Sequence, residues 1–295
     1  MGGRGAYPKV PKGYEAARTH PIFPLLIEMI LITDAKEQVI METIGIVTAM
    51  SQECDAVLRL IEHRNCSDLG PYRCYRFRIL QRNCWLLTSG MGIRRAAQAT
   101  RTLVESANPT LLISVGIAGA VEADLEIGDV IVSKDSSLLG KDGLPGPLQP
   151  LARLSEAAWQ AAERALQRSG ANLFLGSAVT THGGQLVQPQ PAQLTHPILE
   201  METTGIAGVA AEKGLPLLSL RAISDGPRAP IPFDLEKMMD EQDNLRSGEI
   251  LKTIIAHPQM LPGLVRMGRN SRKAADAAAL ALVAALSQPG TVITP

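Results

Sequence analysis

The stretch Leu217–Gly226, LLSLRAISDG, decides the fold that we expect for this chain. Its apolar run is typical of a buried parallel strand, and Pro216 precedes it at a position where a strand tolerates proline. The run ends at Asp225, beside a glycine that allows the chain to turn. Ligands of open α/β sheets bind outside the carboxyl ends of the strands. The sequence therefore predicts a functional site around Asp225.

Two other apolar runs also end in carboxylates. The acidic cluster Glu200–Glu202 follows Pro197–Leu199, and Glu53 follows the strand-like run Ile44–Val47. Ser51 is expected to cap the helix after that run, which places Glu53 in the first helical turn, where an acid also compensates the helix dipole. Three runs that each deliver a carboxylate nevertheless indicate one site built from remote parts of the chain.

Strands and helices alternate along most of the sequence. Hydrophobic patterning predicts strands at 72–79, 84–88, 111–115 and 173–179, and helices at 94–106, 155–169, 204–213, 249–256 and 264–286. This alternation predicts an α/β fold with a single domain, in which helices flank a mixed, largely parallel sheet.

Composition narrows the functional classes. The chain has 295 residues, of which 45% are hydrophobic and 3% aromatic, so an aliphatic core of full size is expected. The formal net charge is zero, which argues against nucleic-acid binding as the main function, although a local basic patch stays open.

Residues 1–40 differ from the rest of the chain. They are rich in glycine and proline, and their apolar stretch at 21–32, interrupted by Pro24 and Glu28, is too short to span a bilayer. A signal peptide is the alternative, but it requires a cleaner apolar segment. We expect 1–40 to be a leader that is disordered or not native, with translation starting at Met41 and the domain covering 41–295.

The cysteines and histidines predict no metal site and no cofactor. No Cys-x-x-Cys pair occurs among the four cysteines, and no two histidines have helical ligand spacing. A disulfide framework is not expected in a chain with so large an aliphatic core. The thiols are therefore expected to stay reduced, in the cytoplasm.

Two glycine-rich segments follow predicted strands. Ser89–Gly92 precedes a predicted helix, and Gly116–Gly119 ends the strand that begins at Leu111. Glycines between a strand and a helix let the backbone approach an anion or ligand closely. Their spacing does not complete the dinucleotide fingerprint, so nicotinamide binding is not predicted.

Five motifs in order carry a resemblance to a known family. They are Ala49–Glu53 (AMSQE), Ser89–Gly92 (SGMG), Gly116–Gly119 (GIAG), Glu200–Glu202 (EME) and Arg221–Asp225 (RAISD). Together they resemble the nucleoside phosphorylase and nucleosidase superfamily, and in particular the methylthioadenosine/adenosylhomocysteine nucleosidases. The resemblance covers about residues 43–225 and implies hydrolysis of the glycosidic bond of an adenine-type nucleoside with a modified 5′ position.

The resemblance also implies roles for individual residues. Cleavage of an N-glycosidic bond passes through an oxocarbenium-like state, so Asp225 would protonate the purine at N7 while Glu53 activates water as general base. Glu202 would accept hydrogen bonds from the ribose hydroxyls. The other residues implied in substrate binding are Met201 against the sugar, Ala118, Gly119 and Ser224 around the base, and Ser89.

The sequence departs from the nucleosidase pattern at three places. Gly183–Leu186 stands where the nucleosidases carry Gly-Asp-x-Phe, so Leu186 replaces the ring that stacks on adenine. Ile117 replaces a serine. The tail from Pro227 is longer than in compact nucleosidases and is more similar to the hopanoid-associated members, which resemble enzymes that remove adenine from a lipid-linked adenosyl group.

Two other functions stay open. A phosphorylase needs arginines on its phosphate, and Arg94, Arg95 and Arg221 keep that alternative, although Ser114 stands where the hexameric phosphorylases carry an arginine. A catalytically silent nucleoside-binding protein is the third reading. In every case the resemblance implies a small-molecule nucleoside as partner and a homo-oligomer, at least a dimer, without nucleic acid or stable membrane insertion.

Overall fold

The computed structural model describes residues 42–187, 192–231 and 261–294. The expected leader, 1–40, and the helix expected at 249–256 lie outside the described residues.

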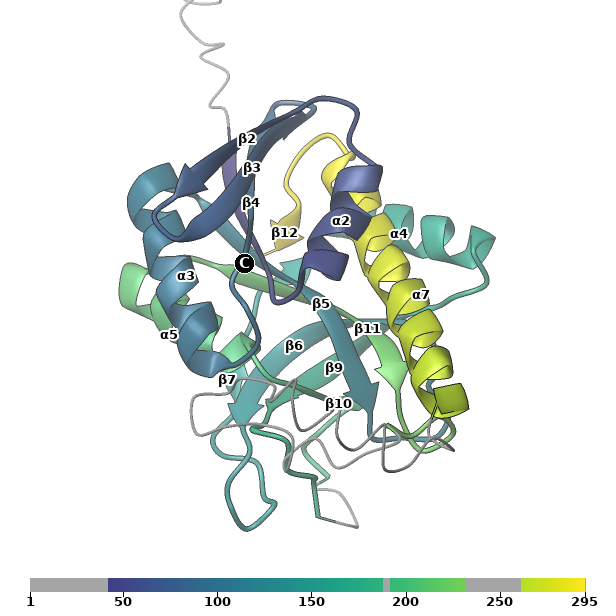
Figure 1. Cartoon of the computed structure of the whole chain (residues 1–295). Coiled ribbons are helices and arrows are strands. Elements are labelled where there is room, and N and C mark those ends of the chain that lie inside the picture. The colour runs from purple at the N-terminus through teal and green to yellow at the C-terminus, as the bar shows by residue number, and fades with distance from the viewer. Residues whose placement is uncertain (1–41, 188–191, 232–260, 295) are drawn as a thin grey trace, which may run out of the picture. The chain divides into compact units, whose positions relative to one another are not determined.

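The described residues form strands and helices in the predicted alternation (Figure 1). The strands are β1 Glu42–Thr48, β2 Arg64–Leu69, β3 Tyr72–Ile79, β4 Arg82–Thr88, β5 Leu111–Ala120, β6 Val130–Leu138, β7 Gln149–Pro150, β8 Arg153–Leu154, β9 Leu173–Thr180, β10 Pro197–Glu200, β11 Leu217–Asp225 and β12 Ile293–Thr294. The helices are α2 Ser51–Arg59, α3 Ile93–Ala107, α4 Glu156–Arg168, α5 Thr203–Lys213 and α7 Leu261–Leu286.

The central sheet is mixed and confirms the predicted α/β class. Its strand order is β10-β9-β6-β11-β5-β1-β4-β3-β2. The neighbours β4, β1, β5 and β11 run parallel, whereas β11 is antiparallel to β6 and the β2–β3–β4 strands form antiparallel pairs. A parallel centre of this kind requires helical connections on its faces.

Strand β5 belongs to two parts of the sheet. Its first half pairs with β1 at Leu111–Ser114, while its end pairs with β10 through Gly119 and Ala120. Because β10 also pairs with β9, the strands β5, β11, β6, β9 and β10 close into a ring. The strand predicted at 111–115 therefore continues through Gly116–Gly119 to Ala120, because pairing with β11 and β10 keeps this glycine-rich segment extended.

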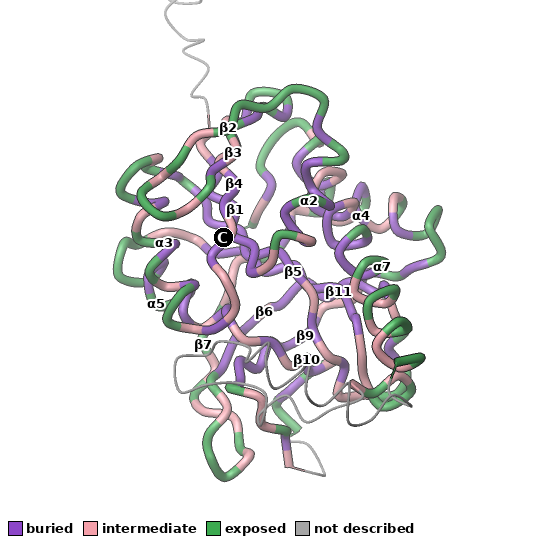
Figure 2. The backbone as a smooth tube through the Cα atoms, viewed as in Figure 1, coloured by how far each residue is buried: buried purple, intermediate pink, exposed green. Residues whose placement is uncertain are grey.

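Helices cover both faces of the sheet. In Figure 1, α3 and α5 lie together on one side, and α2, α4 and α7 lie together on the other. Each group closes over its own apolar core (Figure 2). On α7 the buried alanines recur at helical spacing, and their small side chains let the helix approach β11 and β5 closely; they include Ala274, Ala278, Ala281 and Ala285.

Local differences from the predictions have local causes. Met50, in extended conformation, is the N-cap of α2 in place of Ser51, and the helix ends at Arg59 instead of near His63. The strand β2 was not predicted, because its polar and largely exposed sequence lacks apolar alternation; its pairing with β3 holds it in place. The end of α4 before Gly170 agrees with the prediction.

None of the helices in the described part of the chain combines the length and apolarity that a bilayer crossing requires.

Candidate functional site

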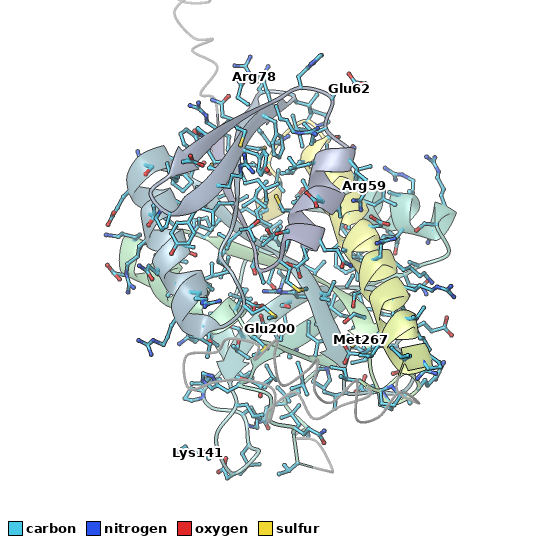
Figure 3. All side chains as sticks on the ribbon, viewed as in Figure 1. Arg59, Glu62, Arg78, Lys141, Glu200 and Met267 are labelled. Atoms are coloured by element: carbon cyan, nitrogen blue, oxygen red, sulfur yellow. The ribbon has the colours of Figure 1, made fainter. Side chains whose placement is uncertain are left out.

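Three separate elements bring the predicted acids towards the end of the sheet where β5 and β11 finish. Glu53 comes from α2, Glu202 is the N-cap residue of α5 directly after β10, and Asp225 is the last residue of β11. Figure 3 shows the neighbouring Glu200 in the interior of the domain, whereas Lys141 lies at its edge. The glycine-rich part of β5 runs between these side chains.

The backbone holds the Glu53 carboxylate in place. Its Oε2 accepts hydrogen bonds from the amides of Ala49 (2.8 Å) and Met50 (2.9 Å), and its Oε1 accepts one from the Ile117 amide (3.0 Å). The residue is 3% exposed. Burial raises the pKa of Glu53, while the charge of Arg221 and these three amides oppose the rise. Glu53 is thus an oriented and unusually basic carboxylate.

Arg221 joins two other carboxylates inside the site. Its Nη2 lies 3.0 Å from Glu200 Oε2, and its Nη1 lies 3.3 Å from Glu202 Oε2. Nη2 also donates to the Ser114 hydroxyl at 2.8 Å. Burial lowers the pKa of Arg221, but the surrounding carboxylates outweigh that effect and raise it, so the guanidinium stays charged.

Glu200 is bonded on every side. Its Oε2 accepts from the amides of Glu202 (2.9 Å) and Thr203 (2.8 Å) and from the Thr203 hydroxyl, and its Oε1 accepts from the Thr180 hydroxyl. Since these bonds and Arg221 occupy the carboxylate, Glu200 fixes the turn between β10 and α5. It thereby sets the position of Glu202.

Glu202 keeps more freedom for a ligand. Its Oε1 accepts one hydrogen bond, from the Gly92 amide at 3.1 Å, and its Oε2 faces Arg221. Burial raises the pKa of Glu202 to about 7, against the effect of Arg221, and the nearby Glu200 and Glu53 raise it further. Three carboxylates around one guanidinium make this region rich in negative charge.

Asp225 lies at an irregularity in β11. The register with β5 shifts between Ile223 and Asp225, and this bulge aims the side chain at Gly119. A Cβ at Gly119 would lie 2.6 Å from Asp225 Oδ1, so a larger residue there would displace the Asp225 carboxyl group. Burial raises the pKa of Asp225, while a hydrogen bond of 2.7 Å from the Ser224 hydroxyl opposes the rise.

Gly116 separates Glu53 from Arg221. A Cβ at Gly116 would lie 2.4 Å from Arg221 Nη1 and 2.7 Å from Glu53 Oε1. The two charged groups therefore face the same small space over the β5 backbone. A side chain at this position would occupy it.

The other predicted binding residues come from β5, β11 and the turn before α5. Ala118 and Gly119 are on β5, and the Ser224 hydroxyl lies 3.3 Å from the Ala118 carbonyl. Met201 is half-buried between Glu200 and Glu202. Gly119 and Ser224 therefore lie beside Asp225, and Met201 precedes Glu202 in the chain.

Ser89 and Leu186 contact other partners. The Ser89 hydroxyl is within bonding distance of the carbonyls of Thr48 (3.2 Å) and Gly90 (2.7 Å), at the turn that leads to Gly92. Leu186 is buried in a separate apolar cluster with Val179 and Leu194.

The sequence analysis did not predict that Arg221 holds the centre of the site together. It was considered only as a phosphate ligand, whereas the structure pairs it with two glutamates. A signal was present in the sequence, because an arginine inside an otherwise apolar strand must find a buried counter-charge. Glu200 was part of a quoted motif, but its pairing with Arg221 was not predicted either.

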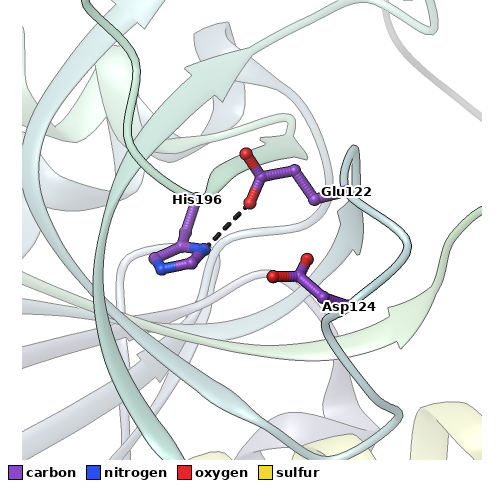
Figure 4. A group of neighbouring side chains, drawn as sticks. All are labelled: Glu122, Asp124 and His196. Carbon is purple, nitrogen blue, oxygen red and sulfur yellow. Dashed lines mark hydrogen bonds and ion pairs between the residues drawn. The ribbon is translucent and has the colours of Figure 1, made fainter.

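Among the described residues, one group of side chains has metal-ligand chemistry. Ligand atoms of Glu122, Asp124 and His196 lie within 4.8 Å of one another (Figure 4). His196 Nδ1 is 2.9 Å from Glu122 Oε2. The His–Glu pair accounts for this geometry without an ion. Sequence spacing did not reveal the group, because His196 is remote along the chain from the two acids.

Comparisons with known proteins agree with the motifs. The family model of the phosphorylase superfamily matches residues 43–256. Among curated relatives, the 5′-methylthioadenosine/S-adenosylhomocysteine nucleosidase of Haemophilus influenzae (strain PittEE) is 28% identical over 224 residues, 72% of this chain and 98% of the relative. The enzyme of the same name from Halalkalibacterium halodurans is 29% identical over 211 residues, 66% of this chain and 90% of the relative.

Solved structures show the same fold. The Neisseria meningitidis 5′-methylthioadenosine/S-adenosylhomocysteine nucleosidase, in complex with methylthio-immucillin-A, aligns with a TM-score of 0.58 at 19% identity over 83% of this chain and 99% of its own. Futalosine hydrolase of Helicobacter pylori aligns with a TM-score of 0.57 at 18% identity over 84% and 98%. With the family model spanning most of the domain, the chain belongs to the phosphorylase superfamily.

Proposed function

We propose that the protein is an N-ribosyl hydrolase that cleaves the glycosidic bond of an adenine-type nucleoside with a modified 5′ position. The observation that carries the proposal is the placement of Glu53 and Arg221 together against Gly116, with Asp225 farther along the same pair of strands. The curated relatives named as methylthioadenosine/adenosylhomocysteine nucleosidases support this class of reaction.

Asp225 acts on the leaving base. A purine leaves more readily when N7 is protonated, so the group beside it must carry a proton near neutral pH. Burial raises the pKa of Asp225 and favours the protonated acid. Ser224 orients the carboxyl group, and Gly119 leaves the space in which the base approaches it.

Glu53 acts at the sugar. Its carboxylate, held by three amides, accepts a proton from a water molecule as that water attacks the anomeric carbon. The Glu53 and Arg221 groups facing Gly116 leave a polar position for such a water. The positive charge that develops on the ribose is stabilised by the surrounding carboxylates.

Glu202 and Met201 hold the ribose. The Glu202 carboxylate accepts hydrogen bonds from the ribose hydroxyls, and the Met201 side chain packs on the sugar. The Gly92 amide and Arg221 keep the Glu202 carboxylate in position for these contacts. Leu186, which stands where the nucleosidases carry the stacking ring, packs with Val179 and Leu194 instead, and Ser89 shapes the turn beside the sugar.

The charge of the site favours water over phosphate as the nucleophile. Arg221 is already paired with Glu200 and Glu202, and Glu53 lies close to it. A phosphate dianion next to these carboxylates would be repelled, whereas a neutral water molecule is not. Hydrolysis is therefore the first assignment.

One observation favours the phosphorylase alternative. A Cβ at Gly90 would lie 3.3 Å from Arg95 Nη1, so this guanidinium lies over the turn between β4 and α3. An arginine on a glycine-rich turn is a typical phosphate ligand. A nucleoside-binding protein without catalytic activity is the third hypothesis. The presence of Glu53, Glu202 and Asp225 argues against it.

Base release with and without phosphate separates these functions. The purified protein is incubated with methylthioadenosine, adenosylhomocysteine or inosine, and free base and sugar are quantified. Adenine and free ribose derivative without phosphate would support the hydrolase. Base release that requires phosphate and yields a ribose 1-phosphate would establish a phosphorylase. Nucleoside binding without base release would establish a nucleoside-binding protein without catalytic activity.

The proposal extends to location and assembly. We infer a cytoplasmic homodimer that acts on a small-molecule nucleoside and has no nucleic-acid partner. The cysteines of the described residues are free thiols, which agrees with a reducing compartment. Size-exclusion chromatography with light scattering tests the dimer, and a mass corresponding to one chain would contradict it.

A further inference from the structure

The first half of α7 presents three cations on one face. Arg269, Arg272 and Lys273 have the i, i+3, i+4 spacing that brings helical side chains together, and all three are exposed. None of them forms an ion pair with a described residue. Asp276 lines the same face and is paired with Arg59 of α2. Among the described residues, positive charge therefore exceeds negative charge on this face.

These cations line a cavity of about 640 Å³. The opposite walls come from Gln52 in the first turn of α2 and from Ser169 and Ala171 at the junction of α4 and β9. In Figure 1, α7 lies between α2 and α4, which explains how three elements remote in sequence form one groove. We call it the α7 groove.

Gln52 contributes a donor without an acceptor. Its Nε2 atom is buried and forms no hydrogen bond within the structure. Such donors are rare in folded proteins, because an unsatisfied buried N–H loses its bond to water without a replacement. The neighbouring cations exclude another donor as its partner. A group that offers acceptor oxygens and tolerates positive charge would satisfy this donor.

We propose that the α7 groove binds an oxyanion, the phosphoryl group of a small molecule, through Arg269, Arg272, Lys273 and the Gln52 amide. Guanidinium and ammonium groups form their strongest hydrogen bonds with such oxygens. The volume of the groove admits a group of this size together with part of the molecule that carries it.

The α7 groove is separate from the acid site. Gln52 precedes Glu53 in α2, but the Glu53 carboxylate faces Ile117 on β5, whereas Gln52 faces α7. The two sites also have opposite charge. The inference therefore does not depend on the proposed hydrolase activity.

Isothermal titration of the full chain with inorganic phosphate and with pyrophosphate tests the proposal. Ionic strength is held constant with chloride, because exposed charges are screened by salt. The double variant Arg269→Gln/Arg272→Gln and, separately, Gln52→Leu are each expected to weaken binding by about tenfold or more. The control Arg266→Gln removes a cation from the same helix outside the groove and should change affinity by less than about twofold.

Three results would overturn the proposal. No binding of either anion up to about 10 mM would leave the groove without its ligand. Equal affinity in the wild type and both groove variants would place the anion elsewhere, for example beside Arg95. Equal weakening by Arg266→Gln would indicate general attraction to a basic surface. Matching circular dichroism spectra and melting temperatures establish that the variants are folded.

Discussion

Arg221 and Glu200 form an ion pair in the interior of the domain, with Nη2 3.0 Å from Oε2 and with side chains that are 2% and 0% exposed. A buried guanidinium cannot be left alone, because removing one partner of such a pair costs about 3–5 kcal/mol. We therefore expect Glu200→Ala to lower the free energy of unfolding by about that amount, measured by urea denaturation.

The control for this variant is Glu212→Ala, which removes an exposed acid whose pairs with Arg101 and Lys213 are on the surface. Exposed pairs contribute about 0–1 kcal/mol. Equal changes in the free energy of unfolding for the two variants would contradict a stabilising role of the buried Arg221–Glu200 pair.

Asp225→Asn is expected to reduce kcat by about 10²–10⁴-fold, because the amide cannot protonate the leaving base. Binding of a nucleoside analogue, measured by calorimetry, should change far less. Glu126→Gln, an exposed acid paired with Arg228, is the control that keeps full activity. Unchanged turnover in Asp225→Asn would remove this residue from the catalytic role.

Glu53→Gln is expected to lower hydrolysis by a similar factor of about 10²–10⁴, since an amide is a poor base for water. The amide oxygen can still accept from the backbone at the start of α2, but the amide NH2 would face the Ile117 N–H, so the melting temperature should also fall. Full hydrolytic activity in this variant would show that another group activates the nucleophile.

Gly116→Ala tests the space between Glu53 and Arg221. The new methyl group would lie 2.4 Å from Arg221 Nη1, so these side chains must move and activity should be lost. Gly208→Ala in α5 is the matched control, because a Cβ there meets nothing within 4 Å. That substitution should keep activity and stabilise the helix by up to about 1 kcal/mol. Similar activities for both variants would contradict the geometry.

The stability of the protein should depend on pH through Glu202. Its pKa of about 7 in the folded chain exceeds the ordinary value of 4.5, so folding favours the protonated form. The stabilisation from this group is present below pH 4.5 and is lost as pH rises through 7.

Glu202→Gln is neutral at every pH and should escape this loss. Between about pH 5 and pH 8 the wild type should lose stability relative to Glu202→Gln, by on the order of 3 kcal/mol. Denaturation midpoints at both pH values measure the difference. Parallel pH dependence of the two proteins would mean that Glu202 does not titrate as described.

The strand ends that carry Asp225, Glu200–Glu202 and Glu53 were accessible from the sequence. Each follows a short apolar run, and the parallel strands β1 and β11 place their carboxyl ends at one edge. Strand β10 is antiparallel to β5 and brings Glu200–Glu202 to the site through the ring of strands. The end of α4 was also predictable, because Gly170 stops a helix through its own backbone. In these places a local pattern determines the structure.

Two segments have a structure that depends on strand pairing with remote parts of the chain, which their local sequence does not indicate. Gly116–Gly119 has the composition of a turn, but hydrogen bonds to β11 and β10 keep it extended as part of β5. The polar strand β2 exists only because β3 pairs with it. Neither outcome is visible from neighbouring residues, because pairing energy depends on a partner remote in sequence.

The sequence by itself determined the fold class and which carboxylates stand at strand ends. Only the tertiary structure decided that Arg221 pairs with Glu200 and Glu202, that Gly116 separates it from Glu53, and that cations of α7 face Gln52. The reason is physical. Hydrophobic periodicity is a property of a segment, whereas the pairing of buried charges and the space between them depend on how segments pack against one another.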